Sequence, residues 1–111
     1  MQVYKIFRQA EWDVLDRSGA TAGSADDVRD GFIHFSTADQ TPKTLEKHFA
    51  GETELILAAL ETDALGDALR WEISRGGQEF PHLYRELNRE EVLWHAPIPT
   101  TGVTQLLEGK E

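Results

Sequence analysis

The stretch Asp30-Gly-Phe-Ile-His-Phe-Ser-Thr37 decides the predicted fold, because the rest of the chain can be placed around it. Its aromatic and β-branched residues are typical of a strand, and the glycine before them is typical of a turn. Side chains alternate across a strand, so Ile33 and Phe35 are expected to face the core. Phe32, His34 and Ser36 then share the opposite face, which is expected to carry the chemistry. The sequence therefore predicts a short strand with one apolar and one polar face.

A helix is predicted directly after this strand. Thr37-Ala-Asp-Gln40 has the spacing of a capping box, which predicts a helix over residues 38–49. Pro42 leaves a second start open, with Thr41 as the N-cap and the proline at the first helical position. Polar side chains beside a helix N-terminus predict a binding corner. From this stretch alone, His34 is either a ligand contact or a structural histidine satisfied by its neighbours.

The other elements alternate between strand and helix patterns. Strands are predicted at residues 2–7, 54–61, 69–74 and 91–98, where apolar residues alternate or form a run bounded by acids. For residues 54–61 a helix is the alternative, because a short apolar run does not show which period it follows. A helix is predicted over 9–17, a capped turn over 24–27, and one helical turn between 62 and 69. Residues 100–111 lack a strong period, and the last four are expected to fray.

These elements predict one α+β domain, spanning residues 1–111, with two main helices. The expected core includes Leu55 and Leu57 from a strand covered on both faces, and Trp71 and Ile73 from one face of the next strand. A chain of 111 residues is long enough for one such core and too short for a second.

The composition excludes several classes of function. The chain has no cysteine, which rules out disulfides, a thiol nucleophile and cysteine-ligated metal sites. Its net charge of −9 disfavours nucleic acid and anionic lipid as partners, because both are bound through Lys and Arg. The N-terminus lacks a secretory pattern and no apolar run is long enough for a membrane span, so a cytoplasmic protein is expected.

Familiar catalytic patterns fit poorly. Ser36, His34 and Glu72 supply the residue types of a serine hydrolase, but residues two apart on one strand stand roughly 6–7 Å apart and no nucleophile elbow is present. The four histidines have no metal-ligand spacing, so no metal site is predicted. No Walker loop or dinucleotide-binding glycine motif occurs either.

A mixed polar and aromatic set remains, from two regions of the chain: His34, Ser36, Gln40, Arg70, Glu72, Arg75, His82 and Tyr84. Such a set suits a polar ligand with hydroxyls and a phosphate, in which arginine donates and an aromatic ring stacks. A structural interpretation is also open. Glu72 and Arg75 are three residues apart and can pair with each other, while the nearby aromatic rings fill the core.

The loop after the fourth predicted strand is expected to complete a site. Gly76 and Gly77 allow a tight turn, and we predict that residues 75–84 fold back beside the central strand. The side chains expected to meet in one pocket are His34, Ser36, Arg75, His82 and Tyr84. The alternative is that the two histidines open onto different surfaces and each satisfies only its own loop.

Four segments together resemble a known family: residues 31–37, Gln40, residues 70–77 and Phe80-Pro-His-Leu-Tyr84. In order and spacing they resemble the family catalogued as domain of unknown function 952, over nearly the whole chain from Tyr4 to about Ile98. The resemblance implies the ADP-ribosylation fold, with a split or strongly bent mixed β-sheet. Residues 33–36 also look like the His-Leu-Ser element of RNA 2'-phosphotransferases of that superfamily.

The resemblance also implies a substrate and roles. Enzymes of this class act on NAD, so His34 is expected at a ribose hydroxyl, Tyr84 or Phe80 on the nicotinamide, and Arg75 at a phosphate. The catalytic candidates are His34 and, by residue type only, Glu72; the ligand-binding candidates are Ser36, Gln40, Arg75, Phe80, His82 and Tyr84. The positively charged transition state of such enzymes needs a carboxylate, and no glutamate clearly occupies the transferase position. The alternative is a non-catalytic module that binds a small anionic ligand or a partner protein.

Overall fold

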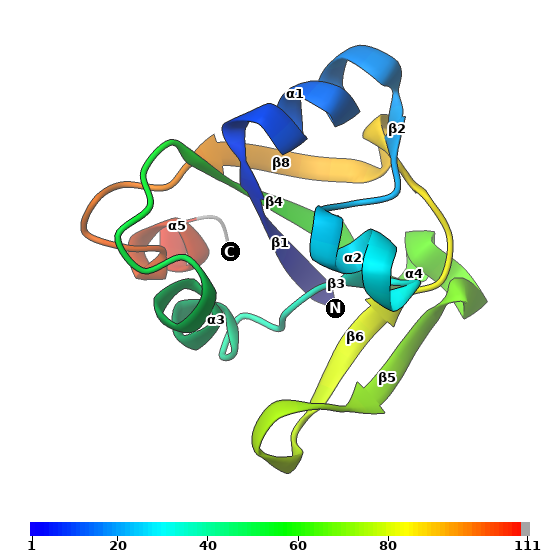
Figure 1. Cartoon of the computed structure of the whole chain (residues 1–111). Coiled ribbons are helices and arrows are strands. Elements are labelled where there is room, and N and C mark those ends of the chain that lie inside the picture. The colour runs from blue at the N-terminus through cyan, green and yellow to red at the C-terminus, as the bar shows by residue number, and fades with distance from the viewer. Residues whose placement is uncertain (110–111) are drawn as a thin grey trace.

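Three small antiparallel sheets form the framework of the protein (Figure 1). The computed structural model describes residues 1–109, apart from the side chain of Arg75. The first sheet has the order β1-β4-β8, with β1 Gln2–Arg8, β4 Leu55–Glu61 and β8 Val92–Pro97. The second pairs β2 Ala20–Thr21 with β7 Leu87–Asn88. The third has the order β3-β6-β5, with β3 Ile33–His34, β5 Leu69–Ile73 and β6 Glu79–Leu83.

A single bridge connects the first sheet to the segment that follows β3. The N–H of Tyr4 donates to the carbonyl of Ser36 at 2.8 Å, and the N–H of Ser36 donates back at 2.9 Å. The predicted α+β class and the predicted strands are confirmed. The expected mixed sheet is wrong, because each pairing between the described strands is antiparallel.

The helices are short: α1 Gln9–Ser18, α2 Ala25–Asp30, α3 Thr41–His48, α4 Thr62–Leu65 and α5 Thr104–Gly109. Three 3-10 turns lie at Gly66–Ala68, Arg75–Gly77 and Arg89–Glu91. Among residues 1–109, no helix combines the length and the apolar character needed to cross a membrane. The two main predicted helices correspond to α1 and α3, and the predicted turns before β3 and β5 correspond to α2 and α4.

The start of α3 combines both sequence signals. Gln40 Oε1 accepts from the N–H of Thr37 at 3.0 Å, and Thr37 Oγ1 accepts from the N–H of Gln40 at 3.3 Å. The capping-box contacts are therefore present, yet the helix begins at Thr41, with Pro42 in its first turn. Proline is tolerated there because the first N–H groups of a helix have no partner within it.

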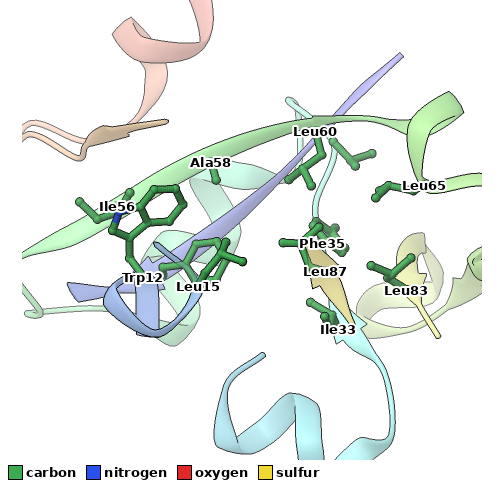
Figure 2. Close-up of a cluster of buried hydrophobic side chains, with 12 residues drawn as sticks. Trp12, Leu15, Ile33, Phe35, Ile56, Ala58, Leu60, Leu65, Leu83 and Leu87 are labelled. Atoms are coloured by element: carbon green, nitrogen blue, oxygen red, sulfur yellow. The ribbon is translucent and has the colours of Figure 1, made fainter. Parts of the chain in front are cut away.

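Strand β4 separates two apolar clusters. Ile56, Ala58 and Leu60 face one cluster with Trp12 and Leu15 of α1, as Figure 2 shows. The alternate residues Leu55, Leu57 and Ala59 face the other. The prediction of a strand covered on both faces is confirmed, including Leu55 and Leu57 in the core. Ile33 and Phe35 are also buried, as their positions in the strand predicted.

The core prediction for β5 is wrong. Trp71 is 38% exposed and Ile73 is 73% exposed, whereas Leu69 on the same face packs partly against the core. The β5–β6 hairpin extends away from the rest of the molecule (Figure 1), so only its near end reaches the apolar cluster. Alternation identified one face of this strand, but local sequence carries no information on whether that face is covered.

The C-terminal helix α5 was not predicted. Val103, just before it, is buried, and Leu106 and Leu107 pack against the cluster around Leu57. A helix of six residues has fewer than two turns, so its apolar pattern hardly repeats and resembles that of a loop. Residues 110 and 111, part of the predicted frayed end, lie outside the described residues.

Candidate functional site

Asp27 is the buried centre of the site. Its N–H donates to Ser24 Oγ at 3.2 Å, and its Oδ2 accepts from the N–H of Ser24 at 2.9 Å, which is the capping box that starts α2. Lys5 Nζ lies 2.9 Å from the same Oδ2, and both side chains are buried. Burial by itself raises the pKa of Asp27, but the hydrogen bond from His34 and the charge of Lys5 outweigh it, so this pKa lies well below its ordinary value.

His34 is held by two carboxylates. Its Nδ1 lies 2.6 Å from Asp27 Oδ1, and its Nε2 lies 3.2 Å from Asp30 Oδ2. The backbone of His34 takes part as well, because its N–H donates to Asp27 and its carbonyl accepts from Lys5 Nζ at 3.1 Å. An ionised carboxylate only accepts hydrogen bonds, so Nδ1 of His34 donates to Asp27 Oδ1.

His82 lies opposite His34 across the β3–β6 pair, with the two ring centroids 5.3 Å apart. Its Nδ1 is 2.8 Å from Glu72 Oε1, and its ring stacks on Phe32 at a centroid distance of 4.1 Å. The side chain is 5% exposed. Within the described part of the chain, Nε2 of His82 is buried without a hydrogen-bond partner.

Glu72 and Tyr84 lie behind His82. The Tyr84 hydroxyl donates to Glu72 Oε1 at 2.7 Å, and the guanidinium of Arg70 lies 5.2 Å from the Tyr84 ring centroid. The hydrogen bonds from Tyr84 and His82 lower the pKa of Glu72, and the same contact with Glu72 raises the pKa of Tyr84. Glu72 therefore has a contact that orients His82, and the side chain of Arg75, its expected partner, lies outside the described residues.

Ser36 and Gln40 connect the central strand to its surroundings. Ser36 Oγ lies 3.0 Å from Thr44 Oγ1 of α3, and the side chain of Ser36 is buried. Gln40 Nε2 donates to the carbonyl of Glu79 at 2.8 Å, which attaches the start of α3 to β6. Both residues therefore have structural contacts, in addition to any contact with a ligand.

A cavity of about 300 Å³ lies where these elements meet. Four of the predicted site residues line it: His34, Ser36, Phe80 and His82. Its described lining does not include Gln40, Arg70, Glu72 or Tyr84, although the last two reach it indirectly through His82. The side chain of Arg75, predicted at a phosphate, lies outside the described residues. The structure thus brings the two histidines to one cavity rather than to different surfaces.

Several lining residues were not predicted, namely Lys5, Arg8, Asp27, Arg29, Asp30 and His48. Lys5 carries a sequence signal, because a charge between Tyr4 and Ile6 stands in a strand otherwise rich in apolar residues. A buried lysine requires a partner charge. The sequence does not say which of the many acids provides it, because Asp27 is far away along the chain.

Three solved structures of protein CC0527 are similar to this chain. The crystal structure of protein CC0527 from Caulobacter crescentus is 42% identical and has a TM-score of 0.91, covering 97% of this chain and 99% of that one. A double mutant of CC0527 has the same values. Its solution NMR structure is 45% identical over 97% of this chain and 95% of that one, with a TM-score of 0.80.

No curated protein matches the chain significantly. The family model described as "Protein of unknown function (DUF952)" matches residues 6–95, which include the described lining of the cavity apart from Tyr4 and Lys5. The relationship therefore agrees with the resemblance drawn from residues 31–37 and 70–84. The chain belongs to the DUF952 family.

Proposed function

We propose that the cavity binds NAD or a related nucleotide and that the protein is an enzyme of the ADP-ribosylation class. The observation that carries the proposal is the meeting of His34, Ser36, Phe80 and His82 on one cavity. Hydroxyl, imidazole and aromatic groups are those that orient a ribose and stack on a base. At about 300 Å³, the cavity lies at the lower end of the range for small-molecule sites.

Charge supports an anionic ligand. The whole chain has a net charge of −9, yet the cavity lining holds as many cations as carboxylates: Lys5, Arg8 and Arg29 against Asp26, Asp27 and Asp30. Three histidines add further donors: His34, His48 and His82. This part of the surface therefore repels a phosphate far less than the rest of the molecule does.

The position of Glu72 favours a second candidate, a non-catalytic binding module. An ADP-ribosyl transfer needs a carboxylate near the positively charged ribosyl carbon. Glu72 does not belong to the described lining of the cavity and is hydrogen-bonded to His82 and Tyr84. Asp27 does line it, but that carboxylate is already ion-paired with Lys5 and hydrogen-bonded to His34. The same cavity can therefore hold a nucleotide without promoting transfer.

Thermal unfolding with NAD, ADP-ribose and a 2'-phosphorylated oligoribonucleotide tests both candidates. A ligand at a hundred times its Kd stabilises the folded state by about 2.7 kcal/mol, which raises the Tm of a domain of this size by roughly 10 °C. We expect such a rise with NAD, together with nicotinamide release detected by chromatography. His34→Ala is expected to abolish the rise, because it removes a lining side chain.

His95→Ala is the matched control, since His95 stacks on Trp12 away from the cavity. This variant is expected to keep the ligand response. Stabilisation without nicotinamide release or loss of the 2'-phosphate would favour the binding module. Unchanged Tm values with each of the three compounds would contradict both candidates.

A further inference from the structure

His82 lines the cavity and has one ring nitrogen without a hydrogen-bond partner among the described residues. Its Nδ1 is turned toward Glu72 on β5. Buried ring nitrogens are usually hydrogen-bonded, yet Nε2 of His82 has no partner among the described residues. Nε2 is therefore the atom of this histidine that is available to a bound molecule.

The contacts of His82 determine its tautomer and its orientation. An ionised carboxylate can only accept, so Nδ1 must carry the proton in the contact with Glu72. In the neutral ring, Nε2 then holds a free lone pair. Phe32 stacks on the ring at an interplanar angle of 24°, and the Tyr84 hydroxyl holds Glu72 in place at 2.7 Å. A histidine oriented through Nδ1 by a carboxylate is the usual arrangement of a general base.

The neighbouring histidine has no ring nitrogen left without a neighbouring polar group. Nδ1 of His34 lies 2.6 Å from Asp27 Oδ1 and Nε2 lies 3.2 Å from Asp30 Oδ2. His34 therefore offers a ligand no unpartnered ring nitrogen like Nε2 of His82. The two histidines, 5.3 Å apart, therefore differ in what they can do for a ligand.

We propose that His82 is the general base of this cavity and that Glu72 is its positioning residue. The proposal rests on the function proposed above. The acceptor, water in the simplest case, gives a proton to Nε2 while its oxygen bonds to the ribosyl carbon of NAD. The bond from that carbon to the nicotinamide nitrogen breaks, and its electron pair leaves with nicotinamide. His82 then releases the proton to solvent.

Measuring the tautomer of His82 tests the proposal without requiring enzymatic activity. Two-bond ¹H–¹⁵N spectra of labelled protein separate protonated from unprotonated ring nitrogens, and single histidine replacements assign the four residues. At mildly alkaline pH we expect a protonated Nδ1 and an unprotonated Nε2 at His82. Glu72→Ala is expected to move the proton toward Nε2, whereas the exposed control Glu86→Ala leaves the spectrum unchanged. A protonated Nε2 in the unaltered protein would overturn the proposal.

Kinetics with NAD as the probe test the base directly. His82→Gln is expected to lower kcat by about 10²- to 10⁴-fold with little change in KM, because a general base acts in the transition state. Glu72→Ala is expected to lower kcat less, and Glu72→Asp to restore part of the loss. If the His82→Gln variant folds and keeps its full kcat, His82 is not the general base, while the proposed function still holds. If the unaltered protein does not turn over NAD, the proposed function fails. The ¹H–¹⁵N spectra then still show whether Nε2 of His82 is unprotonated and can accept a proton.

A separate observation concerns β5, which ends the sheet β3-β6-β5. The N–H of Ser74 donates to Gln78 and the N–H of Tyr84 donates to Ala68, so even-numbered residues of this strand point their backbone groups toward β6. The backbone groups of Trp71 and Ile73 then point away from the sheet. Trp71 lies opposite Pro81 in a pair without mutual backbone hydrogen bonds.

The sequence of β5 is complementary to itself. In an antiparallel pairing of two copies centred on Trp71, Arg70 lies opposite Glu72 and Leu69 lies opposite Ile73. Such a pairing covers the exposed Trp71 and Ile73 on one face. On the other face, each Arg70 is placed beside the carboxylate that orients His82.

We infer that β5 pairs with β5 of a second copy of this chain. Two features support a second copy as the partner: Arg70 and Glu72 are complementary in charge, and the outward backbone groups of β5 can form hydrogen bonds. The resulting interface is two-fold and self-complementary. Strands of five residues bury little compared with the roughly 1,200 Å² of a stable interface, so the dimer is expected to be weak.

Sedimentation velocity over a concentration series tests this pairing. The unaltered chain is expected to shift from monomer toward dimer at high micromolar concentration. Trp71→Pro removes an outward N–H without removing a β5–β6 hydrogen bond, and Ile73→Lys places a charge in the interface, so both are expected to stay monomeric. Leu93→Lys, at an exposed position on β8, is the control that still dimerises. A dimer that persists in both variants, or a chain that is monomeric throughout, would overturn the inference.

Discussion

Replacing Asp27 with asparagine is expected to destabilise the protein by about 3–5 kcal/mol, because a buried charge then loses its partner. Asp27 is 2% exposed, and Lys5, whose Nζ lies 2.9 Å from it, is buried as well. The amide keeps the size of the side chain but cannot neutralise the ammonium. Urea unfolding followed by circular dichroism measures the loss.

Two further variants separate the ion pair from other effects of Asp27→Asn. Asp26→Asn changes the neighbouring exposed acid of the same helix and is expected to alter the unfolding free energy by less than about 0.5 kcal/mol. Combining Asp27→Asn with Lys5→Met removes both charges and is expected to recover at least half of the loss. If the double variant is no more stable than Asp27→Asn alone, the buried pair is not the cause.

Asp27 also predicts a dependence of stability on pH. The pKa of Asp27 is lower in the folded state than in the unfolded state. Its contribution to the unfolding free energy is therefore complete above the unfolded-state pKa of about 3.9 and is lost as the pH falls through the folded-state pKa. The difference in unfolding free energy between the unaltered protein and Asp27→Asn should therefore be constant near neutral pH and shrink below about pH 4. A difference that grows on acidification would contradict the ion-paired state of Asp27.

Gly23→Ala is the second change with a large expected effect, roughly 2–5 kcal/mol of lost stability. Gly23 has a φ of 98°, which L residues rarely adopt, and an added Cβ would lie only 2.7 Å from Cβ of Asp27. Asp27 cannot move away cheaply, because Ser24, Lys5 and His34 all hold it. The substitution is expected to disturb His34 too, so any NAD response should weaken along with stability.

Gly31→Ala is the matched control for this glycine. Its φ of 85° imposes a similar backbone strain, but an added Cβ meets no atom within 4 Å. In the same urea experiment, this variant is expected to lose only the unfolding free energy that backbone strain costs, about 1–3 kcal/mol. Equal losses at the two positions would show that the contact with Asp27 adds nothing.

Much of the fold was predictable because its signals are local. The run Leu-Ile-Leu-Ala-Ala-Leu before Glu61 predicted β4, and Ser24 with Asp27 predicted the cap of α2. The site was predictable only in part. The alternation around His34 placed it and Ser36 on one face, and the turn at Gly76 and Gly77 led to the prediction that His82 joins them at one cavity, as it does. Nothing near His82 in sequence shows that its Nδ1 contacts Glu72.

By itself, the sequence determined the strand and helix pattern, the buried faces of β3 and β4, and membership of the family. These depend on residues a few positions apart, where side-chain period and capping act directly. Only the tertiary structure decided that Asp27 neutralises Lys5, that Glu72 orients His82, and that Trp71 and Ile73 stay exposed. Each of these depends on which strands pair and in which register, because pairing brings together groups that lie far apart along the chain.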